Sequence, residues 1–323
     1  MLREVFGCIE IPDKKQDIQF SMIEIRYKQP FGDRLSMALN KFQTPLCVGI
    51  DPHMLLMPDL FKSSNKKQQI EKLESFSLSC IEAAHNRVPA IKPQVALFEK
   101  FGPEGMGILQ RIGKTAQSAG LLVIMDAKRG DIGSTSNAYA EGWLGEDAAF
   151  YCDALTVNPY LGLDTLKPFI EEAIKGNNGL FILLKTSNPG SSDLQELYCD
   201  DKPIYQHLAD KLSPTINWYV GKTGWSSIGV VVGATNPKEA KLIRKFLPSS
   251  PFLIPGFGAQ GANASMALCG LEYINEKIGY QGGLVNSSRD ITFGKNMSHI
   301  TNISEYVSSI IQNINKSKDK LKL

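Results

Sequence analysis

Short runs of apolar residues recur along the chain, and within them polar residues do not alternate with apolar ones. These runs are residues 45–51 (PLCVGID), 88–92 (VPAIK), 121–128 (LLVIMDAK), 154–158 (ALTVN), 180–186 (LFILLKT), 228–235 (IGVVVGAT), 251–256 (PFLIPG) and 283–287 (GLVNS). Short runs rich in β-branched and bulky residues are typical of parallel strands that are buried on both faces. We therefore predict a strand at each of these runs.

The intervals between the runs have the spacing of amphipathic helices. In residues 68–86 (QQIEKLESFSLSCIEAAHN), for example, Ile70, Leu73 and Phe76 recur at helical spacing. Buried strands that alternate with helices predict an α/β protein with a parallel sheet. Eight such units in about 250 residues match the size of a (β/α)8 TIM barrel. An open, doubly wound sheet is the alternative.

The series of strands and helices is not divided by a linker rich in proline or glycine. We therefore predict a single (β/α)8 barrel catalytic domain over residues 34–313. Residues 1–33 are predicted to be an N-terminal extension of uncertain structure. Residues 314–323 form a polar, lysine-rich end that is expected to fray.

Polar residues gather where the apolar runs end. They include Asp51, Lys92, Asp126, Lys128, Asn158, residues 185–188, Thr235 and Arg289. In barrels the chemistry takes place at the carboxyl ends of the strands, and many strands contribute to it. Open sheets usually hold their ligands with two or three strands at a switch point. The wide distribution of polar ends therefore favours the barrel.

Composition excludes several classes of partner. The 35 basic and 33 acidic residues nearly cancel, so no global field indicates a protein that binds nucleic acid or a membrane. No window approaches the roughly 18 uninterrupted apolar residues of a membrane span. The six cysteines are scattered and show no metal-ligand spacing, which is typical of reduced thiols in the cytoplasm. We expect a cytoplasmic protein whose acidic ligand, if it has one, is held by a local site.

The segment 125–135 (MDAKRGDIGST) places opposite charges in alternation at the end of a predicted buried strand. Asp126 and Lys128 are two residues apart, so a regular strand directs both to one face. Lys92 ends an earlier strand, and Asp131 follows Gly130, where the chain can turn. A buried salt-bridge network is one interpretation. The further charges at other strand ends favour a catalytic centre.

A phosphate site is predicted after the last two runs. Residues 254–265 (IPGFGAQGANAS) contain Gly256, Gly258 and Gly261 around Gln260, and Arg289 follows the next run. Loops at these places in barrels commonly hold phosphate with backbone N–H groups and a cation. A generic glycine-rich turn beside a solvated arginine is the alternative.

The neutral polar segment after the fifth run has two possible roles. Thr186, Ser187 and Asn188 either read the edge of a heterocycle or cap the following helix. Trp143 and Trp218 fall in helical stretches and are expected in the core.

No metal site and no pyridoxal or thiamine motif is evident, so we expect no metal and no cofactor.

Together these residues resemble the orotidine 5'-phosphate decarboxylase family. The resemblance extends from about Thr44 to Arg289 and is carried by KPQ, DAKRGDIGST, KTSNPGS and PGFGAQG. It implies decarboxylation of orotidine 5'-monophosphate to UMP, the last step of de novo pyrimidine synthesis, without a cofactor. The implied charged tetrad is Lys92, Asp126, Lys128 and Asp131. Lys128 would face the carbanion and protonate C6.

The resemblance also implies the remaining site residues and a homodimer. Asp51 and Lys92 would bind the ribose hydroxyls, with Thr135 assisting from across the subunit interface. Ser187 would contact the pyrimidine, with Pro255 near the base, and Ile132 would also bind the substrate. Gln260 and Arg289 would hold the phosphate. Asp131 and Thr135 would enter the site of the neighbouring subunit. Ser288 stands where other branches of the family commonly carry glycine, so the backbone contribution beside Arg289 is in question.

Two other functions remain open at this point. A Mg2+-dependent sugar-phosphate decarboxylase of the same suprafamily would share the Asp-x-Lys-x-x-Asp pattern, but it would need an acidic metal ligand nearby. A non-catalytic barrel that binds UMP as a sensor would have no need of a costly buried charge cluster.

Overall fold

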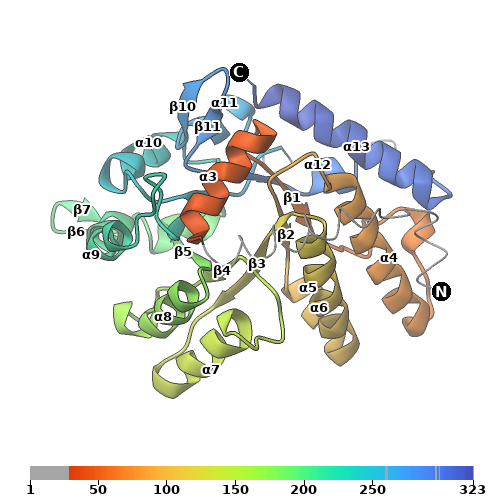
Figure 1. Cartoon of the computed structure of the whole chain (residues 1–323), viewed down its shortest axis with the longest axis horizontal. Coiled ribbons are helices and arrows are strands. Elements are labelled where there is room, and N and C mark those ends of the chain that lie inside the picture. The colour runs from red at the N-terminus through yellow and green to blue at the C-terminus, as the bar shows by residue number, and fades with distance from the viewer. Residues whose placement is uncertain (1–28, 259–260, 295–296, 298, 323) are drawn as a thin grey trace.

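The computed structural model describes residues 29–258, 261–294, 297 and 299–322. Its centre is a closed barrel of parallel strands with helices around it (Figure 1). The order of the strands around the barrel is β1-β12-β9-β8-β5-β4-β3-β2. The strands are β1 (Leu46–Ile50), β2 (Ala90–Pro93), β3 (Leu122–Arg129), β4 (Ala154–Val157), β5 (Gly179–Lys185), β8 (Ile228–Val232), β9 (Phe252–Ile254) and β12 (Gly283–Ser287). Each lies within or overlaps one of the predicted runs. The predicted (β/α)8 TIM barrel is thereby confirmed, and the open sheet is wrong.

Helices surround the barrel, as Figure 1 shows. The longer ones are α4 (Lys66–Ala84), α6 (Gly102–Ser118), α7 (Gly133–Leu144), α8 (Lys167–Lys175), α9 (Ile204–Trp218), α10 (Pro237–Phe246) and α13 (Ile303–Lys320). Shorter ones are α5 (Ala96–Glu99), α11 (Ala264–Leu268), α12 (Arg289–Thr292), η1 (Asp59–Phe61), η2 (Leu163–Thr165) and η3 (Pro189–Asp193). Two small antiparallel hairpins pair β6 (Tyr198–Cys199) with β7 (Lys202–Pro203) and β10 (Glu272–Asn275) with β11 (Gly279–Gln281).

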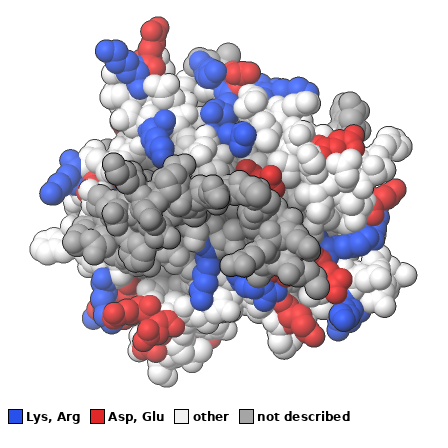
Figure 2. All heavy atoms as spheres, turned by 45° about the vertical axis from the view of Figure 1, so that its right-hand side comes forward, with Lys and Arg blue, Asp and Glu red and all other residues white. Residues whose placement is uncertain are grey.

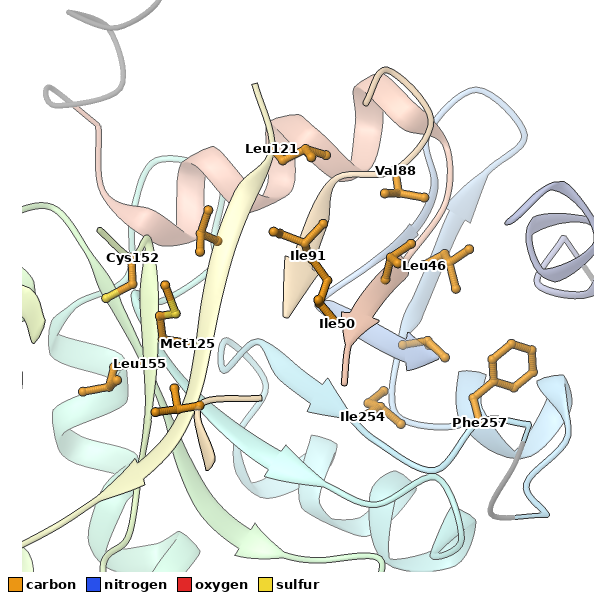
Figure 3. Packing of buried hydrophobic residues seen from close by; sticks show 14 of the residues in the cluster. Leu46, Ile50, Val88, Ile91, Leu121, Met125, Cys152, Leu155, Ile254 and Phe257 are labelled. Carbon is orange, nitrogen blue, oxygen red and sulfur yellow. The ribbon is translucent and has the colours of Figure 1, made fainter. Parts of the chain in front are cut away.

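The barrel strands are buried on both faces, which explains why their sequences lack alternation. One cluster of buried residues fills the layer between strands and helices; Figure 3 shows part of it, with Leu46 and Ile50 on β1 and Leu155 on β4. A second cluster fills the barrel interior and includes Cys47 and Ile124. Successive residues of β1 thus belong to different clusters.

Helix α3 (Phe31–Phe42) packs against the interior cluster from the amino-terminal end of the barrel. Phe31, Leu35 and Leu39 are all buried there, and the ring of Phe31 lies edge-on to Phe181 at 5.8 Å between centroids. Because this helix fills the amino-terminal end, the carboxyl-terminal end is left for a ligand. Helix α3 begins before the predicted start of the barrel domain at residue 34, and residues 1–28 of the predicted extension lie outside the described residues.

The lysine-rich end was expected to fray, but most of its described residues continue a helix. Residues 314–320 are the last turns of α13. Ile314 and Leu321 are buried, and the Lys318 ammonium donates to the carbonyl of Arg87 at 2.9 Å. Because apolar positions recur with helical spacing among the lysines, this segment packs on the core although its composition is polar.

The two tryptophans differ. Trp143 is buried and its ring stacks on Phe150 at 4.5 Å, as expected of a core residue. Trp218 is 81% exposed at the end of α9, so its predicted place in the core is wrong.

The surface of the described residues shows charges of both signs. On the face in Figure 2, Lys and Arg side chains are interspersed with Asp and Glu. Among the residues that the structure describes, no helix combines the length and the apolar character that a membrane crossing requires.

Candidate active site

A pocket of about 850 Å³ opens at the carboxyl ends of the barrel strands. Most of the residues singled out in the sequence line it, although they come from distant parts of the chain. They are Asp51, Lys92, Asp126, Lys128, Ser187, Pro255, Gly256 and Arg289.

Asp126 is the centre of the charged cluster. Its Oδ2 accepts from the ammonium of Lys92 at 2.8 Å and from the amide of Gln94 at 3.2 Å. Its Oδ1 accepts from the ammonium of Lys128 at 2.5 Å. Asp126 and Lys92 are buried, whereas the side chain of Lys128 is 47% exposed. Of the two ammonium groups, that of Lys128 is therefore the more accessible from the pocket, and a reacting group can approach it there.

The neighbouring charges keep the buried groups of this cluster ionised. Burial alone would raise the pKa of Asp126, but the ammonium groups of Lys92 and Lys128 outweigh it and hold that pKa well below its usual range. Burial alone would lower the pKa of Lys92, but Asp126 and Asp51 outweigh it and raise that pKa. Both groups are therefore charged at neutral pH.

Strand β3 reaches this arrangement through a bulge. Met125 pairs with Leu155 on β4, and the next pair joins Arg129 to Val157, so β3 uses two more residues than β4 over this stretch. Lys128 has a φ of 50°, a left-handed value that is uncommon outside glycine. Asp126 and Lys128 do meet, as their spacing predicts, but through a bulge rather than a regular strand. Bulges often re-aim side chains beside active sites.

Sequence reasoning missed several polar residues of the pocket, among them Gln94, Thr156 and Asn286. Gln94 bonds to Asp126, and the hydroxyl of Thr156 bridges Asp126 and the backbone of Lys128. Asn286 lines the pocket from β12 and is 7% exposed. Thr156 and Asn286 are polar residues at inward positions of buried runs, and this pattern could have indicated that they line the pocket.

Two buried acceptor atoms of the pocket have no hydrogen-bond partner within the described part of the chain. They are Oδ1 of Asp51 and Oδ1 of Asn286. Asp51 follows β1 and Asn286 lies on the adjacent strand β12. A buried acceptor without a partner costs about 1–3 kcal/mol, so a ligand that donates hydrogen bonds here is favoured.

The segment after β5 forms another wall of the pocket. The Gln195 side chain accepts from the Thr186 N–H at 2.8 Å and donates to the Thr186 hydroxyl at 2.9 Å. Lys185 is fully buried and pairs with Glu196 at 2.9 Å. These contacts fix the backbone next to Ser187, which is half-buried and lines the pocket.

The predicted phosphate residues fall into three groups. Arg289 is exposed and lines the pocket together with Gly256. Gly258 and Gly261 have φ values of 84° and 92°, but they do not line this pocket. The N–H of Gly258 donates to Ala262, and that of Gly261 donates to Gly258. Gln260 lies outside the described residues.

Asp131, Ile132 and Thr135 are not among the residues that line the pocket. Asp131 Oδ1 accepts from the N–H of Ile132 at 2.8 Å. Ile132 is 61% exposed, and Thr135 is exposed in the first turn of α7. Among the described residues, no group of His, Cys, Asp and Glu has the arrangement of a metal site.

A closed (β/α)8 barrel with a charged pocket at the carboxyl ends of its strands has the architecture of a TIM-barrel enzyme. Residues 44–297 match the family model described as "Orotidine 5'-phosphate decarboxylase / HUMPS family". The chain belongs to this family, which confirms the resemblance drawn from the sequence.

Named relatives agree with the family model. The chain is 39% identical to an orotidine 5'-phosphate decarboxylase of Rhodopirellula baltica over 81% of this chain and 88% of that protein. It is 42% identical to one of Streptomyces coelicolor over 72% of this chain and 81% of that protein. The structure of Leishmania donovani OMP decarboxylase matches with a TM-score of 0.65 and 30% identity, over 90% of this chain and 99% of that one.

Proposed function

We propose that this chain is a carboxy-lyase that decarboxylates orotidine 5'-monophosphate to UMP within a single barrel domain and without a cofactor. The observation that carries the proposal is the ion-paired cluster of Lys92, Asp126 and Lys128 at the pocket. It stands in a chain whose relatives carry the name of this activity.

The reaction requires stabilisation of a localised negative charge. When the bond between C6 and the carboxylate breaks, CO2 leaves and the electron pair stays on C6, where no adjacent carbonyl can absorb it. A fixed ammonium beside C6 stabilises that charge electrostatically. Lys128 serves this purpose, and one of its protons then passes from Nζ to C6.

Asp126 contributes mainly by holding the two ammonium groups. A carboxylate at ~4 Å from the substrate carboxylate repels it by roughly 4 kcal/mol at an effective dielectric constant of 20. Enzymes generally lower barriers by about 8–23 kcal/mol. Repulsion between Asp126 and the leaving carboxylate is therefore too small to be the whole mechanism, and stabilisation of the carbanion by the ammonium of Lys128 contributes as well.

The other pocket residues bind the nucleotide. The unpartnered oxygen of Asp51 accepts from a ribose hydroxyl, with Lys92 beside it. Ser187 and Pro255 line the base side. Arg289 binds the phosphate with Gly256, and Gln260 assists. Binding energy from this remote phosphate helps to order the reacting end.

The active protein is a homodimer in this proposal. Asp131 and Thr135 lie outside the pocket of their own chain and serve the site of the partner subunit. Ile132, which lies between them, is proposed to bind the substrate. Exposed apolar residues next to Asp131 and in the loop after β4, whose Asn158 N–H donates to the carbonyl of Arg129, support a covered surface. They are Ile132, Tyr160 and Leu161, exposed by 61%, 74% and 50%.

The cytoplasm is the proposed location. All described cysteines are free thiols, which suits a reducing compartment. No nucleic acid or membrane takes part.

The test follows the ultraviolet absorbance of orotidine 5'-monophosphate in the presence of EDTA. Purified protein is expected to convert the nucleotide without added metal. Lys128→Ala should lose about 100-fold or more in kcat while still binding UMP. Lys175→Ala, which removes an exposed lysine, is the matched control and should keep full activity. A wild-type protein that leaves the nucleotide unchanged, or that needs an added metal, contradicts the proposal.

A further inference from the structure

Thr156 on β4 is a fully buried hydroxyl inside the charged cluster. Its Oγ1 accepts from the backbone N–H of Lys128 at 2.9 Å. The same oxygen donates to Oδ1 of Asp126 at 3.1 Å. That Oδ1 also receives the ammonium of Lys128 at 2.5 Å. One hydroxyl therefore links the backbone and the side chain of Lys128 through a single carboxylate oxygen.

The bulge in β3 explains why this hydroxyl is needed. The extra residues of β3 face β4 without a ladder partner between the pairs at Met125 and Arg129. The N–H of Lys128 lies in this gap, and a buried N–H without an acceptor costs about 1–3 kcal/mol. The Thr156 side chain supplies the acceptor that the strand does not.

The backbone of Lys128 must also be held in an unfavourable conformation. Its φ of 50° is costly for a residue with a Cβ, and such values persist where the surroundings impose them. Thr156 is well placed to impose it, because Thr156 is itself fixed by its pairing with Phe181 on β5. The geometry of the reactive ammonium thus depends on a rigid neighbouring strand.

We infer that Thr156 is a positioning residue, whose hydroxyl holds Lys128 in its bulged conformation and aims its ammonium at the reacting carbon. This inference rests on the proposed function. It predicts that losing the hydroxyl slows the chemical step and leaves nucleotide affinity nearly unchanged.

The experiment compares Thr156→Val, which keeps the shape but removes the hydroxyl, with Thr156→Ser, which keeps the hydroxyl. Thr156→Val should lower kcat by about 10- to 100-fold, the effect of misplacing a catalytic group by a fraction of an ångström or losing a bond to a charged group. Its Kd for UMP should stay within about twofold of the wild type, because the charged and polar groups at the other strand ends bind the nucleotide. Thr156→Ser should recover most of the loss in kcat.

Thr44→Val is the matched control. Thr44 is buried, and its hydroxyl also accepts a backbone N–H, that of Leu46 at 3.3 Å, but at the amino-terminal end of β1. Its loss should lower stability without changing kcat. Equal losses of kcat in Thr156→Val and Thr156→Ser, or an unchanged kcat in Thr156→Val, would overturn the inference. So would a fall in UMP affinity as large as the fall in kcat.

A second measurement does not depend on turnover. Amide hydrogen exchange at Lys128 should be slow in the wild type and in Thr156→Ser, and faster in Thr156→Val. If the wild type fails to act on orotidine 5'-monophosphate, the proposed function fails, and the exchange data still decide whether Thr156 holds Lys128. Equal protection of Lys128 in all three proteins would contradict the positioning role.

Discussion

Asp126 receives hydrogen bonds from two ammonium groups, an amide and a hydroxyl, which fill the acceptor capacity of its carboxylate. Removing one cation from a buried pair is costly because the remaining charge loses its compensation. Lys92 is the more deeply buried of the two lysines, since its side chain is 4% exposed and that of Lys128 is 47% exposed. Lys92 is therefore the member of the cluster whose loss should affect stability most.

The variant Lys92→Met tests this at the level of one residue. We expect it to lower the free energy of unfolding by about 3 kcal/mol near neutral pH. Because Asp126 and Asp51 raise the pKa of Lys92 above its ordinary 10.5, the contribution of this charge is fully present below pH 10.5 and is lost as the pH rises further. The difference between wild type and variant should be constant across neutral pH and shrink above 10.5, as measured by urea unfolding.

The same comparison extends to acid. The pKa of Asp126 lies below its ordinary 3.8 in the folded wild type, so its contribution is present above pH 3.8 and is lost as the pH falls below it. Lys175→Met removes an exposed lysine and should change stability by no more than about 0.5 kcal/mol at any of these pH values. A difference for Lys92→Met that varies steeply between pH 5 and 9 would contradict the assignment of charges.

At the level of single residues, the sequence predicted a role mainly where the relevant residues lie close together in one segment. The spacing of Asp126 and Lys128 correctly predicted that they meet, although a bulge and not a regular strand brings them together. The role of Thr156 was not predictable, because it depends on a shift of register between two strands that no local pattern records. Asn286 was missed although its inward position in a buried run was a signal, because one amide alone does not show whether it lines a pocket or bonds within the core.

Among the elements, the strands were predicted well because burial on both faces removes polar residues from them. The end of helix α13 was predicted wrongly, because its last turns are rich in lysine and were expected to fray. Lysines on the outer face of a helix do not prevent its inner face from packing, and long lysine stems can cover apolar surface. Charge composition therefore misled where spacing would have been informative.

Helix α13 offers a test of this packing. Ile314 is fully buried in the segment that was expected to fray, whereas Ile303 at the start of the same helix is 41% exposed. Ile314→Ala should lower the free energy of unfolding by about 2–5 kcal/mol, as for other buried large-to-small changes. Ile303→Ala should cost clearly less. Thermal or urea unfolding of both variants measures the difference, and equal small effects would mean that the end of α13 contributes little to the core.

For the whole molecule, closure of the barrel decides where chemistry can occur. Helix α3 fills the amino-terminal end, with Arg34 paired to the buried Asp153, and the interior below the pocket is packed with apolar side chains. The charged residues therefore meet at the only end that is left for them by this packing of the described chain. Their meeting point followed from the fold, while the contribution that we propose for a second subunit involves surfaces outside this chain.

The shared site predicted for the homodimer can be tested by mixing two inactive variants. Lys128→Ala destroys the site of its own chain, and Asp131→Asn destroys the site of the partner subunit. In a mixed dimer the chain that carries Asp131→Asn keeps its own Lys128 and receives Asp131 from its partner, so one intact site forms. After unfolding and refolding together in equal amounts, half of the dimers should be mixed, and activity should recover to about one quarter of the wild type. Assays of the mixture against each variant refolded alone measure this recovery, with sedimentation to confirm the dimer. If Asp131 acted within its own chain, both sites of every mixed dimer would lack a residue and no recovery would be seen.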